Sequence, residues 1–257
     1  DRDLGGLSVQ RLHIEGTDGG SSAIGLVNNQ NSTGQAAIYF SKSRGTSVNS
    51  NTVLQSGDPM GALVFCGSDG SDMVSVGAEI RTEVDGTPGS NDMPGRIVFK
   101  TTADGAATAT ERLRIDKEGG FIFSNGALLE KVNITAGKLS DNTNIDLDDG
   151  MVHYFTTEET TTCTPNIRVN SSTSLNDIMT AGDVVTVTVV TTADATGYSA
   201  NWTIDGNAVT EEWVGGSAPS AGGSDGLDIY VLTIICIHAS NTGDSGFKVI
   251  ANLTNAT

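Results

Sequence analysis

The first half of the chain repeats a pattern of apolar and polar positions that is typical of β-hairpins. A short apolar run, a Gly-containing polar loop and an alternating segment follow one another in residues 61–81 and again in residues 95–116. Because side chains alternate between the two faces of a strand, Leu113 and Ile115 share one face and their charged neighbours face water on the other. The pattern predicts two strand–loop–strand units, and the apolar run at 34–40 resembles the first half of a third.

The second half of the chain carries stronger strand signals. The β-branched run 184–190 predicts a strand, and residues 229–237 are apolar on both faces, which is typical of a central or intersubunit strand. The spacing in residues 171–183 predicts a short helix, and Asp205 followed by Gly206 predicts a hairpin turn. Strand spacing and Gly-rich turns together predict a β-sandwich of roughly 100 residues.

These patterns predict an all-β protein with three parts. Residues 1–118 form a β-hairpin-rich fibre domain, residues 119–150 a connector, and residues 151–257 a C-terminal antiparallel β-sandwich tip, jelly-roll-like in arrangement. The polar stretch 141–150 sets the second boundary. Residues 127–132 are compatible with either a short helical turn or a strand.

Composition and charge narrow the possible partners. With 32 glycines and 5 prolines, the chain has the composition of many turns between short strands. The 31 acidic and 14 basic residues give a net charge of −17, which repels nucleic acid and anionic membranes but suits salty surroundings. No apolar run is long enough for a membrane span. We therefore expect no nucleic-acid partner and no membrane insertion.

The sequence offers no motif for catalysis or for cofactor binding. The loop of the second hairpin, TTADGAATAT, matches no phosphate-binding motif. The stretch 145–150 fails the spacing of a calcium loop, and the three cysteines lie too far apart for a Cys-rich zinc site. Glu158 and Glu159 are neighbours on a predicted strand, so their side chains point to opposite faces. We expect no catalytic residue, no metal, no cofactor and no enzymatic activity.

Aromatic residues flank one long Gly/Ser-rich loop, residues 215–226. Trp213 precedes this loop and Tyr230 follows it. Aromatic rings beside such loops often present a sugar- or protein-binding face, and core packing of the rings is the alternative. Together with the nearby carboxylates Asp225 and Asp228, they form the candidate receptor-contact set.

Two stretches resemble phage structural proteins. Residues 94–116, PGRIVFKTTADGAATATERLRID, resemble a segment that recurs in bacteriophage tail fibres and other virion appendage proteins, where it often precedes a self-cleaving chaperone domain that this chain does not resemble. Stretches within residues 126–223 are similar to the C-terminal part of virion structural proteins of marine cyanobacterial phages (cyanophages). Together the resemblances cover residues 95–257, whereas residues 1–94 match only in style.

The resemblance implies a non-enzymatic tail fibre that takes part in host-surface adsorption and receptor binding. It implies an intertwined homotrimer on the virion, with other tail or neck proteins and a host cell-surface glycan or protein as further partners. One alternative is a head-decorating or neck-attached virion structural protein. A second is a host-glycan depolymerase, against which the lack of a long β-helix repeat ladder speaks.

Overall fold

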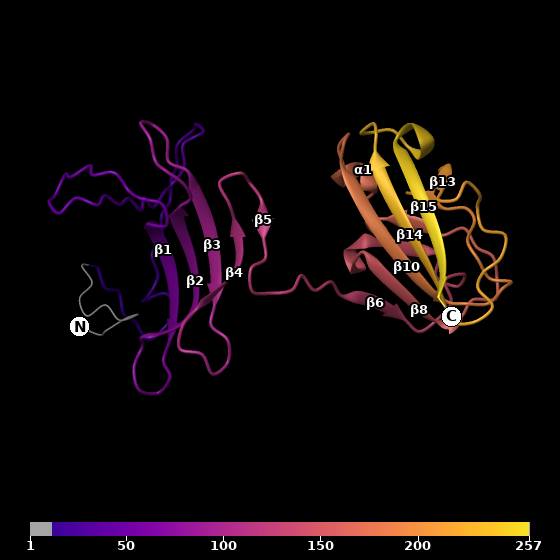
Figure 1. Cartoon of the computed structure of the whole chain (residues 1–257), viewed down its shortest axis with the longest axis horizontal. Helices are drawn as coiled ribbons and strands as arrows, with labels where there is room; N and C mark the ends of the chain where they lie inside the picture. The colour runs from indigo at the N-terminus through magenta and orange to yellow at the C-terminus, as the bar shows by residue number, and fades with distance from the viewer. Residues whose placement is uncertain (1–11, 257) are drawn as a thin grey trace. The chain divides into compact units, whose positions relative to one another are not determined.

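The computed structural model describes residues 12–256, and the chain divides into two compact units, Asp1–Leu128 and Leu129–Thr257. Residues 1–11 of the predicted fibre domain lie outside the described residues. In both units, nearly all of the regular secondary structure is β-strand (Figure 1). The predicted all-β class, with a hairpin-rich N-terminal part and a C-terminal sandwich, is confirmed.

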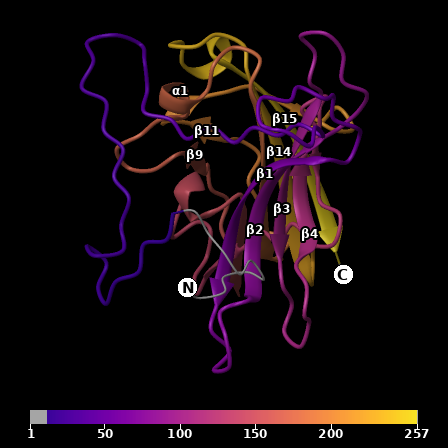
Figure 2. The same cartoon turned by 90° about the vertical axis from the view of Figure 1, so that its left-hand side faces the viewer.

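The first unit contains one antiparallel five-stranded sheet, in which the strands follow the order of the sequence (Figures 1 and 2). Its strands are β1 (Pro59–Gly67), β2 (Ser75–Val84), β3 (Gly95–Thr101), β4 (Thr110–Ile115) and β5 (Phe121–Ile122). The pairs β1–β2 and β3–β4 are the two predicted strand–loop–strand units. The third apolar run, at 34–40, forms no strand, because no alternating segment follows it to pair with.

Residues 12–58 contain no helix or strand and run as long open excursions (Figure 1). Near its end this segment is held to the sheet by Asp58. The Asp58 carboxylate accepts hydrogen bonds from Arg44 Nε at 2.6 Å and Nη2 at 2.7 Å, and its backbone carbonyl accepts one from the N–H of Val84 at 2.9 Å. The Arg44 guanidinium holds the pKa of the Asp58 carboxyl well below its usual range.

The second unit is a sandwich of two sheets. The larger sheet has the order β13-β15-β14-β10-β8-β6 and the smaller one β12-β11-β9-β7. The strands and the one α-helix of this unit are β6 (Val132–Thr135), β7 (Asn144–Asp146), β8 (Val152–Glu158), β9 (Asn166–Arg168), α1 (Leu175–Ile178), β10 (Val184–Thr192), β11 (Thr203–Ile204), β12 (Asn207–Ala208), β13 (Glu211–Trp213), β14 (Leu227–Cys236) and β15 (Phe247–Ala256). Figure 2 shows β9 and β11 of the smaller sheet beside α1.

The core of the sandwich lies between the two sheets. The larger sheet contributes one face of β10, β14 and β15, and the smaller sheet contributes Ile145, Ile167 and Ile204. Each of these three isoleucines is almost completely buried. Burying an aliphatic side chain of this size contributes roughly 1.5–3 kcal/mol, so these three side chains make a substantial contribution to the packing of the two sheets.

Strand directions in the sandwich are more mixed than the predicted antiparallel, jelly-roll-like arrangement. β10, β14 and β15 pair antiparallel, but β6–β8, β8–β10, β7–β9 and β9–β11 are parallel pairs. From β6 to β10 the chain visits the two sheets in turn. Two successive strands of the same sheet therefore run in the same direction, because the strand between them, in the other sheet, returns the chain to the end where the first strand began.

The predicted connector at 119–150 is not a separate segment. β5 belongs to the first sheet, and β6 and β7 belong to the sandwich, so the division falls between Leu128 and Leu129. The polar stretch at 141–150 contains the core strand β7, in which Ile145 is completely buried although its neighbours in the sequence are polar. A single apolar residue in a polar run gives too weak a periodicity to predict a strand.

The remaining local predictions agree with the structure. β14 is a central strand between β10 and β15, and α1 begins with the capping box that Ser174 and Asp177 form. Asp205 and Gly206, with φ of 51° and 76°, make the predicted hairpin turn between β11 and β12.

Acid should loosen the attachment of residues 42–58 to the first sheet. The pKa of Asp58 is lower in the folded chain than its value of about 4 in the unfolded chain, so its stabilising effect is complete above that pH and declines as the pH falls towards the folded pKa. We expect Asp58→Asn to lower stability at pH 7 and to flatten its decline below about pH 4. Urea unfolding followed by circular dichroism at several pH values measures this.

Asp104→Asn is the matched control, because Asp104 is exposed in the loop between β3 and β4. Its pH profile should follow that of the parent chain. If Asp58→Asn also follows the parent profile, the Asp58 anchor does not contribute to acid sensitivity.

Candidate functional site

Two residues of the predicted receptor-contact set, Asp228 and Tyr230, lie inside the sandwich. Their exposed fractions are 0% and 1%. The ring of Tyr230 makes an edge contact with Trp202 at a centroid distance of 5.5 Å, and its hydroxyl oxygen accepts the N–H of Ser199 at 3.0 Å. The prediction is therefore wrong for both residues, because the even-numbered side chains of the central strand β14 all point into the core.

Asp228 has a structural task at the end of the Gly-rich loop. Its carboxylate accepts the N–H of Gly223 at 3.0 Å and the Asn255 side-chain amide at 2.6 Å. A Cβ added at Gly223 would come within 2.8 Å of that carboxylate, so the loop needs glycine at this point. Asp228 thus ties the loop to β15.

The other two residues of the set, Trp213 and Asp225, remain candidates for contact. Trp213 is partly buried against the core and lines a pocket of about 310 Å³ together with Asn201 and Glu212. Asp225 is exposed, and its carboxylate accepts only the N–H of the adjacent Gly226 among the contacts of the described residues. Trp213 ends β13 just before the loop that joins β13 to β14, and Asp225 lies near the end of that loop.

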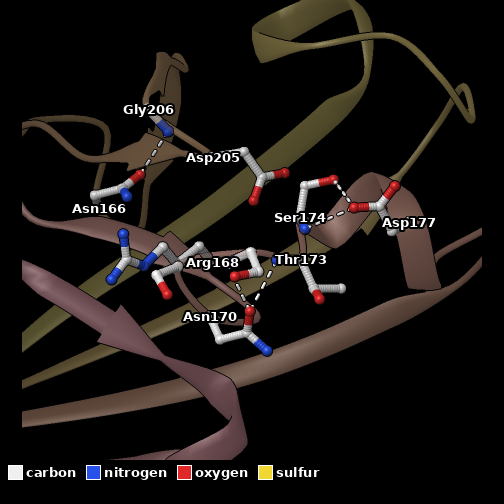
Figure 3. A pocket seen from close by; sticks show the side chains of 10 residues that line it. Asn166, Arg168, Asn170, Thr173, Ser174, Asp177, Asp205 and Gly206 are labelled. Atoms are coloured by element: carbon white, nitrogen blue, oxygen red, sulfur yellow. Dashed lines mark hydrogen bonds between the residues drawn. The ribbon is translucent and has the colours of Figure 1, made fainter.

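A polar pocket of about 400 Å³ lies beside α1 and contains none of the predicted contact residues (Figure 3). Its side chains mostly bind one another or the backbone. Asp177 accepts the Ser174 hydroxyl at 2.8 Å, and Asp205 accepts the N–H of Leu175 at 3.0 Å. Arg168 is paired with Asp146 at 2.6 Å. These contacts build the local fold and leave little free hydrogen-bonding capacity for a ligand.

Neither a metal cluster nor a membrane-spanning helix is found among residues 12–256. Burial, and to a smaller extent the nearby Asp177 carboxylate, raise the pKa of the Asp205 carboxyl, but this carboxylate is engaged by the N–H of Leu175 at the start of α1. The surface with the greatest capacity for interaction is instead in the first unit.

One face of the five-stranded sheet in the first unit is apolar. The strand register places Leu63, Ile80, Phe99 and Leu113 in one row across four strands. A second row contains Ile97, Ile115 and Phe121, and a third contains Phe65. We call this surface, defined by these eight residues, the apolar sheet face.

The apolar sheet face has no second layer within residues 12–128. Leu63 is 49% exposed, Phe65 55% and Phe121 67%, and the remaining members are partly exposed. Phe40 approaches the edge strand β1, where its Cβ lies 2.5 Å from the position of a Cβ added to Gly61, and its own side chain is 54% exposed. An exposed contiguous patch of this kind usually marks an interaction surface.

The opposite face of the same sheet carries an ion-pair network. Glu79 contacts Arg81 at 2.6 Å and Lys100 at 3.9 Å, and Glu83 contacts Arg96 at 2.7 Å. The sequence pattern predicted that the charged residues of this face would be exposed to water. In the structure, the two glutamates are instead buried beneath these cations. The charged face therefore neutralises itself, and the apolar face remains without a partner.

Sequence reasoning found the alternation but missed its consequence. Each of the two predicted hairpins has one apolar face, and the segment before them offers no alternating strand pattern that could cover these faces. These two features together would have predicted an uncovered apolar surface. Residues 97–115, which supply half of the apolar sheet face, also belong to the segment that resembles tail-fibre sequences.

The comparisons with known proteins assign no family to this chain. No family model matches the chain, and no curated protein matches it. Among solved structures, the carboxy-terminal domain of the bacteriophage T5 L-shaped tail fibre matches with a TM-score of 0.34 and 19% identity. The match covers 42% of this chain and 41% of that chain. The chain thus has a weak structural similarity to one phage tail-fibre domain, and a similarity of this size carries no argument about function.

Tyr230 should prove to be a structural residue rather than a contact residue. Tyr230→Phe removes the acceptor of the buried Ser199 N–H, so we expect the free energy of unfolding to fall by about 1–3 kcal/mol. Tryptophan fluorescence during urea unfolding measures this change, because both tryptophans lie in the second unit. Unchanged stability together with weakened host binding would instead restore Tyr230 as a contact residue.

Proposed function

We propose that the chain is a non-enzymatic structural component of a phage virion, a tail fibre that assembles as a homotrimer and takes part in host-surface adsorption. The observation that carries the proposal is the apolar sheet face. It lies on a hairpin, residues 95–116, whose sequence resembles segments of phage tail fibres. The surface proposed for self-assembly and the segment that resembles tail fibres thus share the same residues.

The physical argument for assembly starts from the single layer of the sheet. Apolar area removed from water contributes roughly 25 cal/mol per Å², and the apolar sheet face leaves most of this contribution unused in one chain. Copies of the chain can meet there because the face carries no charge, whereas elsewhere a net charge of −17 drives copies apart. A closed arrangement covers the face of every copy and leaves the ion-paired face outside.

Three copies are proposed because the resemblance is to trimeric appendages. Three single-layer sheets around a threefold axis enclose one shared core, to which each chain contributes a wall. Other tail or neck proteins are the proposed attachment partners. The proposed host partner is a surface glycan or protein, contacted by the loop between β13 and β14 with Trp213 and Asp225 at its ends.

Assembly should depend on which face of β1 carries a new charge. Leu63 and Val64 are adjacent and 49% and 48% exposed, but Leu63 lies on the apolar sheet face and Val64 on the ion-paired face. We expect Leu63→Asp to shift the full chain from trimer towards monomer, because an unpaired carboxylate is costly to bury in an interface. Light scattering after size-exclusion chromatography measures the mass.

Val64→Asp is the matched control and should remain a trimer of 26.5 kDa chains. The proposal fails if the parent chain is a stable monomer at micromolar concentration. It also fails if both variants dissociate equally, since the effect would then lie in the strand and not in the face.

Adsorption should depend on the exposed carboxylate of the β13–β14 loop. We expect Asp225→Ala to reduce binding of the purified protein to host cells several-fold, with assembly unchanged. Asp104→Ala is the matched control, because Asp104 is also an exposed aspartate followed by glycine but lies in the first unit. Cell-binding assays with labelled protein measure this, and equal binding by both variants would remove the loop as the contact site.

A further inference from the structure

The outer face of the larger sheet in the second unit is also almost free of charge. The strand register aligns Ile134, Tyr154, Val190 and Ile229 in one row across β6, β8, β10 and β14. The neighbouring rows continue this surface with Val132, Val152, Thr188, Val231 and Asn252, then Thr186, Thr233 and Ile250, and then Val184 and Ile235. We call these residues, with the first row, the outer sandwich face.

Charged side chains occur only around the margin of the outer sandwich face. Lys248 is paired with Ile235, and Glu212 lies opposite Ile250 on the edge strand β13. Glu158 follows at the end of β8. A solvent-facing side of a sheet is normally polar, yet in a chain with 31 acidic residues none of the acids lies within the rows of this face.

Within residues 129–256, no other element packs on this face. The smaller sheet packs on the opposite side, where Val187, Val189 and Leu232 are buried. Ile134 at one edge is 66% exposed, and Val184 and Ile250 are likewise exposed. The central residues are only partly exposed because their neighbours in the adjacent strands shield them. The sheet thus has one side that forms a core and one uncharged side without a partner.

We propose that the outer sandwich face is a second interface between copies of this chain, separate from the apolar sheet face. The occupant we infer is the same face of another copy. Two copies that each carry a net charge of −17 approach most easily through surfaces without carboxylates, and this face is such a surface. This inference rests on the proposed assembly through the first unit.

Tethering explains how a face with several threonines and few large apolar groups can associate. Residues 123–131, between β5 and β6, contain no helix or strand and link each sandwich to its sheet. Once the first units have assembled, a short linker holds the sandwiches at an effective concentration on the order of millimolar. A weak self-contact is then largely formed, although isolated sandwiches at micromolar concentration would stay apart.

Cysteine cross-linking of the full chain tests the inference. Thr188→Cys places a thiol at the centre of the outer sandwich face with little change in size, and Ser171→Cys places one in the loop after β9, in the polar pocket beside α1 and outside the rows of the face. Ser171 is exposed and Thr188 is only partly exposed, so random collisions would favour Ser171. A short bis-maleimide is added, and covalent dimers are measured on a denaturing gel. The parent chain, with its three native cysteines, gives the background.

We expect Thr188→Cys to form covalent dimers well above background and Ser171→Cys to stay at background. Light scattering on the same samples separates the two proposals. Oligomers without Thr188 cross-links would overturn the second interface and leave the assembly through the first unit intact. Monomers without cross-links would overturn both proposals, and equal cross-linking at both positions would show collision rather than an interface.

Discussion

The structure of the first unit depends on one constraint: a β-sheet has two faces, and a single layer covers neither. This unit satisfies its two faces differently. On one face, arginine and lysine side chains lie over Glu79 and Glu83, and the charges neutralise one another. The other face is apolar, and it is stabilised only when it is buried against another surface. In the proposed assembly, other copies of the chain supply that surface.

The second unit meets the same constraint with a second layer. Ile145, Ile167 and Ile204 close one side of the large sheet, and the chain must cross between the sheets to place them. This crossing produces the parallel pairs β6–β8 and β8–β10. The small sheet can cover only one side, so the opposite side of the large sheet keeps an uncharged surface. In both units, the faces without charge are the places where a strongly acidic chain can tolerate a second copy.

The fate of the predicted contact residues shows how a local pattern can mislead. Aromatic and acidic residues next to a Gly-rich loop are compatible with a binding face and with a core that anchors the loop. In this chain, Tyr230 packs on Trp202 and Asp228 holds Gly223, so both residues shape the loop from inside. Trp213 and Asp225 lie at positions from which a binding partner can be contacted.

Local rules in the sequence determined much of the fold. Alternation identified both hairpins, the β-branched run identified β10, and the turn chemistry of Asp205 identified the β11–β12 hairpin. These features depend on neighbours a few residues apart. What covers each face depends instead on residues distant in the chain. Only the tertiary structure could therefore decide that Ile145 lies in the core, that Glu79 is buried beneath cations, and that the apolar sheet face is open.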